Sequence, residues 1–351
     1  MKKIIFLILL LFPLFADAKS RSTIVMDIGS GRVLYAENES EKKLIASTTK
    51  IMTCIIVLDN CELNQIVTVG NEVLESYGTN IYLEPGEKMK VIDLLYGLML
   101  RSGNDAALTL AVQLFGNEDA FVLKMNNKAR ELGMINTTFE NCHGLDDDTK
   151  NYSTAYDMAI LSQYAYQNAI YRKIISTKKY STKSSTKSYL WYNRVSLLND
   201  YSNCIGGKNG YTPNAGKTLV SIAKKDDLIL TVVSLNDPEI YDHHHKLYDF
   251  LFSEFHNYTI FDKNHFSVSS SFFSNKKVYI KESFIYPFKD DELERIETLV
   301  QIYPSSNKNV VGEINVFLEK KLIHKTYIYE KKQKKEDRKS IFQWFQKLFI
   351  W

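Results

Sequence analysis

The sequence predicts an α+β domain in which helices pack on an antiparallel sheet, followed by a small all-β, sandwich-like domain. Its 351 residues allow about two domains and support a large buried core. Strand patterns begin after residue 21 and return from Lys217, and the region between them is dominated by helical patterns. After about Tyr258 the helical patterns fade and short alternating strands replace them, which predicts the second domain.

Residues 1–18 have the three-part layout of a secretory signal peptide. Two lysines precede an apolar run over 4–15, and the AxA sequence at 16–18 is typical of a cleavage site. The apolar run is too short to span a bilayer. We therefore expect an exported protein that begins near Lys19 and lies at the outer face of the cytoplasmic membrane. The alternative is a buried N-terminal helix.

The first domain is expected over residues 19–258 and begins with a β-hairpin. Residues 22–27 alternate as a strand, a Gly-Ser-Gly turn follows, and 32–36 form the returning strand. A helix is predicted over about 47–58. Four further helices, rich in Ala, Leu and Met, are predicted at 91–100, 104–114, 118–132 and 154–166.

The rest of the chain is predicted to be richer in strands. A stretch heavy in Ser, Thr and Lys at 176–188 indicates an exposed loop or ribbon. Residues 219–223 and 228–235 predict a hairpin, and a helix is expected around 244–252. The second domain is expected over 259–330, with short strands at 278–280, 284–286, 313–318 and 322–329.

The last segment, residues 331–351, differs from the rest in its pattern. It begins with clustered Lys and Arg, and 339–351 forms an amphipathic helical pattern about 20 Å long, too short to cross a membrane. One broad side of that helix carries Ile341, Phe342, Trp344, Phe345, Leu348, Phe349 and Trp351. The pattern predicts an in-plane anchor on an anionic membrane surface, with a tail packed on its own domain as the alternative.

Composition excludes several classes of protein. With 45% hydrophobic residues, 24% charged residues and a formal charge of +3, the chain is neither disordered nor a multi-span membrane protein. The aromatic residues fall at core spacings, so no nucleic-acid partner is expected. The three consecutive histidines 243–245 cannot share a helical face, which favours an exposed helix start over a metal site.

The four cysteines predict no structural disulfide framework. Cys54 and Cys61 lie about 10 Å apart if the first helix forms, which is too far for a direct bridge. A bridge between Cys142 and Cys204 stays open.

A serine and a lysine at the start of the first helix are the strongest chemical signal. Ser47 and Lys50 stand at positions i and i+3, which share a helical face, so the amine can lie beside the hydroxyl. The positive end of the helix dipole favours negative charge that develops there. This arrangement suits a serine nucleophile with an amine base. On its own the SxxK pattern is weak, because it occurs by chance in many chains.

Two further motifs strengthen that interpretation. Ser102-Gly103-Asn104 lies in a turn between two predicted helices, and Lys208-Asn209-Gly210 lies before the strand hairpin. With SxxK, they resemble the three motifs of penicillin-binding proteins and serine β-lactamases, in the same order. Longer stretches resemble the D-alanyl-D-alanine carboxypeptidase family of low-molecular-mass penicillin-binding proteins: 46–52, 93–107, 125–146, 152–159 and 206–220.

The resemblance implies a β-lactamase/transpeptidase-like fold for the first domain and a set of roles. Ser47 would be the nucleophile, Lys50 its base, and Ser102 the proton relay to the leaving amine. The backbone N–H groups of Ser47 and Tyr211 would form the oxyanion hole. The substrate-binding residues implied are Asn104, Lys208, Asn209, Gly210, Tyr211 and Thr212. The substrate would be a peptidoglycan stem peptide ending in D-Ala-D-Ala, β-lactams would acylate Ser47, and neither cofactor nor metal would be needed.

The chain departs from the family pattern in three places. Asn209 replaces the usual Thr of KTG, Cys142 replaces the proline usual before HGLD, and Cys204 precedes the Gly206-Gly207-Lys208 approach. Many members also place an Arg after the hairpin to bind the substrate carboxylate, and between Asp237 and Phe250 the basic candidates here are Lys246 and the histidines. These changes leave two alternatives open. One is a weak or inactive peptidoglycan-binding homologue. The other is a serine β-lactamase, although no candidate Glu has the Asn four residues on that a class A enzyme requires.

Overall fold

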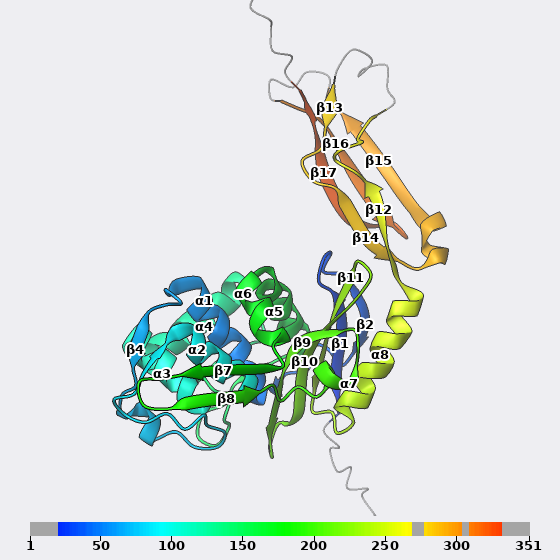
Figure 1. Cartoon of the computed structure of the whole chain (residues 1–351). Helices are drawn as coiled ribbons and strands as arrows, with labels where there is room; N and C mark the ends of the chain where they lie inside the picture. Colours follow the sequence, from blue (N-terminus) through cyan, green and yellow to red (C-terminus); the bar gives the residue numbers. More distant parts are fainter. Residues whose placement is uncertain (1–19, 269–276, 304–308, 332–351) are drawn as a thin grey trace, which may run out of the picture. The chain divides into compact units, whose positions relative to one another are not determined.

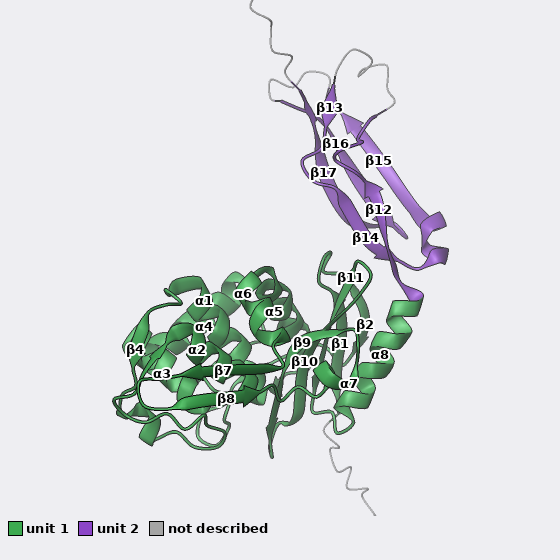
Figure 2. Ribbon diagram, viewed as in Figure 1, with its two compact units in different colours: residues 1–253 green, residues 254–351 purple. Residues whose placement is uncertain are grey.

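The computed structural model describes residues 20–268, 277–303 and 309–331. The chain divides into two compact units, Met1–Ser253 and Glu254–Trp351, slightly before the boundary expected from the sequence (Figure 2). The predicted signal peptide, and all of the predicted anchor except Lys331, lie outside the described residues.

A five-stranded antiparallel sheet organises unit 1, as the sequence predicts (Figure 1). Its order is β2-β1-β11-β10-β9, so the first strand of the chain pairs with the last hairpin of the unit. The strands are β1 (Ser22–Asp27), β2 (Val33–Glu37), β9 (Cys204–Thr212), β10 (Gly216–Lys225) and β11 (Leu228–Leu235). Because β9 lies at the end of this order, one of its edges is free of strand pairing within the sheet.

Both faces of the sheet are covered by helices. Ser221 pairs with Val232 and the next residue pairs with Thr231, so Ser221 and Thr231 point to opposite faces. On one face, Thr231 meets Ser162 of α5 (Ala155–Gln167) at 2.9 Å between the hydroxyl oxygens. On the other, Ser221 contacts the hydroxyl of Tyr248 at 2.8 Å, in α8 (Ile240–Glu254).

Helices and short strands build the rest of unit 1 around a large apolar core. The segment that carries Ser47, the predicted nucleophile, is a short 3₁₀ turn, η1 (Ala46–Thr49), that continues into α1 (Lys50–Asn60). The predicted helix at 91–100 splits into α2 (Val91–Tyr96) and a π-turn, η3 (Gly97–Arg101). The other elements are η2 (Asn71–Leu74), α3 (Asn104–Phe115), α4 (Glu118–Glu131), α6 (Ala169–Ser176), α7 (Leu197–Asp200), β3 (Lys43–Leu44), β4 (Ile66–Thr68), β5 (Lys88–Lys90) and β6 (Tyr152–Ser153).

The Ser-, Thr- and Lys-rich stretch forms a ribbon of β7 (Lys179–Lys183) and β8 (Ser188–Tyr192). It is attached to α2 by Tyr180, whose ring stacks on Tyr96 with centroids 3.6 Å apart and whose hydroxyl donates to Asp93 at 2.6 Å. The aromatic contact explains why a polar sequence holds a defined ribbon here.

Among its described residues, unit 2 is built of β-strands, with a 3₁₀ turn, η5 (Asp290–Arg295), between β14 and β15. One sheet pairs β12 (His256–Phe261) with β14 (Phe284–Phe288), and the other has the order β13-β17-β16-β15. The second sheet comprises β13 (Val278–Tyr279), β15 (Ile296–Ile302), β16 (Val310–Leu318) and β17 (Lys321–Glu330). Phe284 of one sheet and Ile314 of the other share one apolar core, so the two sheets pack together.

The interpretation of the three histidines as an exposed helix start is wrong. Helix α8 begins earlier than predicted, at Ile240, so His244 falls where the helix packs on the sheet and is fully buried. Its Nδ1 lies 2.7 Å from the Ser221 hydroxyl, and His243 pairs with Asp237. Within the described residues no His, Cys, Asp and Glu side chains gather as a metal site.

Two other expectations concern cysteines and membranes. All four cysteines are free thiols, so Cys142 and Cys204 are not bridged. In the described part of the chain, no helix has the length and apolar character needed to cross a bilayer.

Candidate active site

Ser47 and Lys50 lie together, as their spacing predicts. The Lys50 amine nitrogen lies 3.0 Å from the Ser47 Oγ and donates to the Asn104 Oδ1 at 2.7 Å. It also donates to the backbone carbonyl of His143. Lys50 therefore joins the SxxK helix, the Ser-Gly-Asn turn and a third loop, the one that carries His143.

Burial decides the protonation state of Lys50. Its side chain is fully buried, and desolvation lowers the pKa of its amine to about 7, although Asp105 and Cys142 nearby favour the charged form. A neutral amine has two N–H groups and one lone pair. The two carbonyl oxygens of Asn104 and His143 take the N–H groups, which leaves the lone pair facing Ser47 Oγ. The geometry thus favours proton transfer from Ser47 to Lys50.

The loop that carries His143 is held against the nucleophile turn by close backbone packing. Gly144 has φ +92°, and a Cβ at this position would lie 2.0 Å from the carbonyl oxygen of Ala46. Only glycine fits both the conformation and the space. Thr53 of α1 fixes the same loop, because its hydroxyl donates to the Cys142 carbonyl at 2.6 Å.

The ring of His143 is a neutral partner of this site. Burial, together with the charge of Lys50, lowers the pKa of His143 to about 3. The backbone N–H of Leu145 donates to its Nδ1 at 3.1 Å, so the ring proton lies on Nε2. No sequence signal could have revealed the contact between the His143 carbonyl and Lys50, because backbone carbonyls have no residue signature.

The turn of Ser102 and Asn104 is also held in a defined conformation. Ser102 is nearly buried and adopts a left-handed backbone with φ +65°, which is uncommon for a residue with a side chain. Asn104 is oriented by a second hydrogen bond, from its Nδ2 to the Tyr77 carbonyl at 2.7 Å. Asp105, in the first turn of α3, accepts hydrogen bonds from the backbone N–H groups of Ile81 and Leu83, each at 3.0 Å. These bonds tie the start of α3 to the segment around Tyr82.

Strand β9 runs along the nucleophile turn at its unpaired edge. A Cβ on Gly210 would lie 2.7 Å from the backbone nitrogen of Ser47, so glycine is required for this approach. Thr218 of β10 reinforces the contact, because its hydroxyl donates to the Ile45 carbonyl at 3.1 Å. The next residue, Tyr211, is two-thirds exposed (66%). These contacts place the backbone N–H of Ser47 close to the strand backbone next to Tyr211.

Lys208 and Asn209 have neighbours that were not predicted from the sequence, namely the guanidinium of Arg194 and the hydroxyl of Tyr241. Lys208 is fully buried and donates to the Asn209 carbonyl at 2.6 Å. Burial, with repulsion from Lys50 and Arg194, holds the pKa of its amine well below the usual value. Burial raises the pKa of the Tyr241 hydroxyl, and the neighbouring side chains of Asn209 and Ser196 lower it. Arg194 precedes α7, outside the region where an arginine was sought.

The hydroxyl of Thr212 has partners inside the protein. It donates to Asp146 Oδ2 at 2.6 Å and accepts from the backbone N–H of Ala215 at 3.0 Å. Thr212 thereby ties the end of β9 to the loop that carries His143.

The comparisons with known proteins agree with this chemistry. A sequence profile of the D-alanyl-D-alanine carboxypeptidase family, peptidase family S11, matches residues 13–239. The D-alanyl-D-alanine carboxypeptidase DacF of Bacillus subtilis is 33% identical over 255 residues, which are 70% of this chain and 65% of that protein. DacC of Escherichia coli is 36% identical over 228 residues, which are 62% of this chain and 56% of that protein. The chain thus spans less than two thirds of these two relatives.

Solved structures match over a larger share of the chain. Penicillin binding protein 5 from Haemophilus influenzae superposes with a TM-score of 0.73 at 25% identity, over 88% of this chain and 95% of that one. Penicillin binding protein 6B from Escherichia coli gives a TM-score of 0.69 at 28% identity, over 87% and 93%. Because the family profile covers more than half of the chain and encloses Ser47 through Tyr211, the chain belongs to the D-alanyl-D-alanine carboxypeptidase family.

Proposed function

We propose that this protein is a serine D-Ala-D-Ala carboxypeptidase that shortens peptidoglycan stem peptides through an acyl-enzyme on Ser47. The observation that carries the proposal is the Lys50 amine, 3.0 Å from Ser47 Oγ and held by two carbonyl oxygens. Ser47 Oγ bonds to the carbonyl carbon of the penultimate D-alanine, and its proton passes to Lys50. β-Lactams acylate the same oxygen.

The remaining steps use the other motif residues. The amide bond to the terminal D-alanine breaks, and the leaving nitrogen takes a proton by way of Ser102. The N–H groups of Ser47 and Tyr211 stabilise the oxyanion. Water then attacks the ester, releases the shortened peptide and returns the proton to Ser47. Asn104 holds both Lys50 and the substrate amide during the cycle.

The assay that tests this proposal combines two measurements on the wild-type protein. Labelling with fluorescent penicillin reports acylation of Ser47, and D-alanine release from a D-Ala-D-Ala peptide reports turnover. We expect both, with slow release of the bound drug. Rapid release of the drug would indicate a β-lactamase. If only an Asn209→Thr variant releases D-alanine, the natural protein is a peptidoglycan binder.

Carboxylate recognition provides a second test. We propose that Arg194, beside Lys208, supplies the positive charge that binds the terminal carboxylate of the substrate, supported by its electrostatic effect on Lys208. Loss of a charge-assisted hydrogen bond costs about 1.5–3 kcal/mol, or roughly 10- to 150-fold. Arg194→Gln is therefore expected to lower kcat/KM by that factor for the free-acid peptide.

The matched control for Arg194→Gln is the same peptide with a C-terminal amide. It lacks the carboxylate, so its kcat/KM should change little in the variant. An equal loss for both peptides would show that Arg194 only supports the fold. Thermal unfolding of both proteins provides the check on structure.

We also propose that the protein is exported and held at the outer face of the cytoplasmic membrane by residues 331–351. The support is the signal-peptide layout and the basic, amphipathic sequence of the tail. Truncation after Glu330 should yield an active enzyme that no longer binds vesicles containing anionic lipid. The full-length protein on the same vesicles is the control, and unchanged binding by the truncated form would refute the anchor.

A further inference from the structure

The β7–β8 ribbon of unit 1 carries an unbalanced positive charge (Figure 1). Residues 158–199 contain seven Lys or Arg and no Asp or Glu, although the formal charge of the whole chain is only +3. Most of these cations lie on the ribbon, in its turn or at its open end: Lys178, Lys179, Lys183, Lys187 and Arg194. Such a block of one charge sign creates a local field that attracts a polymer of opposite charge.

The outer face of the ribbon combines charged and apolar groups. Lys179 lies opposite Tyr192 in the strand pairing, and its amine is 5.5 Å from the centroid of that ring. Because successive side chains of a strand alternate between faces, Lys183 and Leu190 share this outer face. All four side chains are exposed, whereas the inward-facing Trp191 is buried. The face thus places two ammonium groups beside an aromatic ring and an aliphatic side chain.

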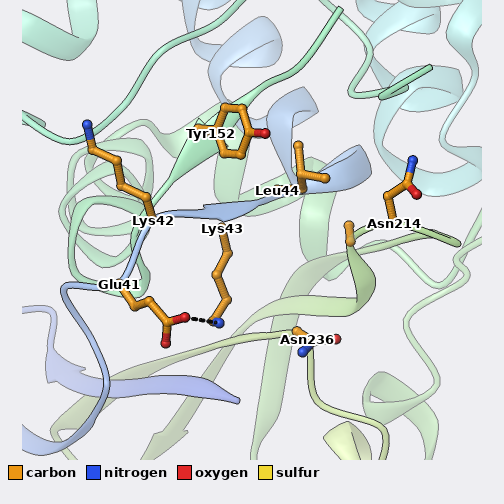
Figure 3. A pocket seen from close by; sticks show the side chains of 8 residues that line it. Glu41, Lys42, Lys43, Leu44, Tyr152, Asn214 and Asn236 are labelled. Atoms are coloured by element: carbon orange, nitrogen blue, oxygen red, sulfur yellow. Dashed lines mark hydrogen bonds and ion pairs between the residues drawn. The ribbon is translucent and has the colours of Figure 1, made fainter. Parts of the chain in front are cut away.

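The two lysines of this face, Lys179 and Lys183, form no ion pair with any described residue. Lys187, in the ribbon turn, differs because it pairs with a glutamate at 2.8 Å. Lysines also line a cavity of about 260 Å³ beside the β9–β10 hairpin, but there Lys43 pairs with Glu41 at 2.8 Å (Figure 3). The charge of the outer face is therefore available to a ligand that carries acidic groups.

The ribbon begins beside the candidate active site. Arg194 follows β8, and its backbone N–H donates to the carbonyl of Leu100 at 3.2 Å, two residues before Ser102. From Lys179, near this end, to Lys183 the outer face extends along β7 for four residues, or about 13 Å. A polymer bound along the face therefore has adjoining segments next to the active site.

We propose that the outer face of the β7–β8 ribbon binds the peptidoglycan polymer, with Lys179 and Lys183 pairing carboxylates of neighbouring stem peptides and Tyr192 packing on a sugar ring. This inference rests on the carboxypeptidase function proposed above and extends it to a substrate class, the polymer in preference to a short peptide. The place of the face beside the active site favours this polymer over a phosphate polymer or a lipid surface, because the substrate must reach Ser47. Binding at two places on one polymer raises the effective concentration of stem peptides there.

The test compares D-alanine release from long, uncrosslinked, soluble peptidoglycan strands with release from a short D-Ala-D-Ala peptide. In the double variant Lys179→Gln/Lys183→Gln, KM for the strands should rise roughly 2- to 30-fold at unchanged kcat, because only binding of the polymer is weakened. KM for the short peptide should change less than about twofold. Tyr192→Ser should also raise KM for the strands alone. Salt at about 0.5 M should reduce the wild-type preference for strands, because it screens exposed charges.

The matched control is Lys320→Gln/Lys321→Gln, which removes two exposed lysines from the β16–β17 turn of unit 2. It should keep the wild-type preference for strands. Penicillin labelling of each variant at the wild-type rate shows that the protein is folded and that Ser47 reacts.

The possible failures are distinguishable. If wild type releases D-alanine from neither substrate, the proposed function fails. If it cleaves both and the ribbon variant changes KM for both equally, or for neither, the ribbon assignment is overturned while the function stands. The same holds if the variant loses binding to vesicles of anionic lipid or to a phosphate polymer while its KM for strands stays at the wild-type value.

Discussion

Replacement of Ser47 by alanine is expected to abolish penicillin labelling and D-alanine release, with a loss of about a million-fold in kcat. The acyl-enzyme needs the hydroxyl oxygen, and no other group replaces it. The fold should persist, because the hydrogen bonds from Lys50 to Asn104 and His143 do not involve Ser47. Labelling on a gel and a D-alanine assay measure both losses.

Ser40→Ala is the control for that variant. Ser40 is exposed, and its hydroxyl contacts only Glu39 among the described residues, at 3.2 Å. Activity and labelling should stay at wild-type levels. Covalent labelling of Ser47→Ala at the wild-type rate would mean that the nucleophile is another residue.

The second-largest expected effect concerns Lys50, whose amine should control how the rate of acylation depends on pH. Because burial lowers the pKa of its amine to about 7, the fraction of neutral amine rises as the pH increases through that value. Only the neutral amine accepts the Ser47 proton, so the acylation rate should rise with pH and level off above the pKa. Rates of penicillin acylation between about pH 5.5 and 8.5 trace this curve.

Lys50→Met should lower acylation by about 10²- to 10⁴-fold, the usual contribution of a general base, and remove the dependence on pH near 7. Lys128→Met is a suitable control, because that lysine of α4 pairs with Asp59 at the end of α1 and with Glu131, and it takes no part in the hydrogen bonds of the Lys50 amine. A wild-type profile that is flat across this range would contradict the role of Lys50 as base.

Residues whose partners are local were predicted well. The hairpin of β1 and β2 and the pair β10 and β11 follow from alternation and turn residues, because side-chain direction in a strand has a period of two. Strand β15 was missed because its pattern is weak: only its end residues are half-buried, and the rest are exposed. Helix α6 was missed as well, and its eight residues are too few for a strong periodic signal.

The sequence alone determined the chemistry that depends on spacing within one element. Ser47 and Lys50 meet because positions i and i+3 share a helical face, and that holds wherever the helix is placed. The order of the three motifs identified the family for the same reason, since short motifs are read directly from the chain.

Tertiary structure decided how those motifs act on one another. It brings Asn104 and the His143 carbonyl onto Lys50, sets Arg194 near Lys208, and buries His244 where α8 packs on the sheet. None of these contacts leaves a local pattern, because the partners lie far apart in the chain or are backbone atoms common to every residue. The pKa of Lys50 belongs to this second class, since desolvation depends on everything packed around the amine and not on its neighbours in sequence.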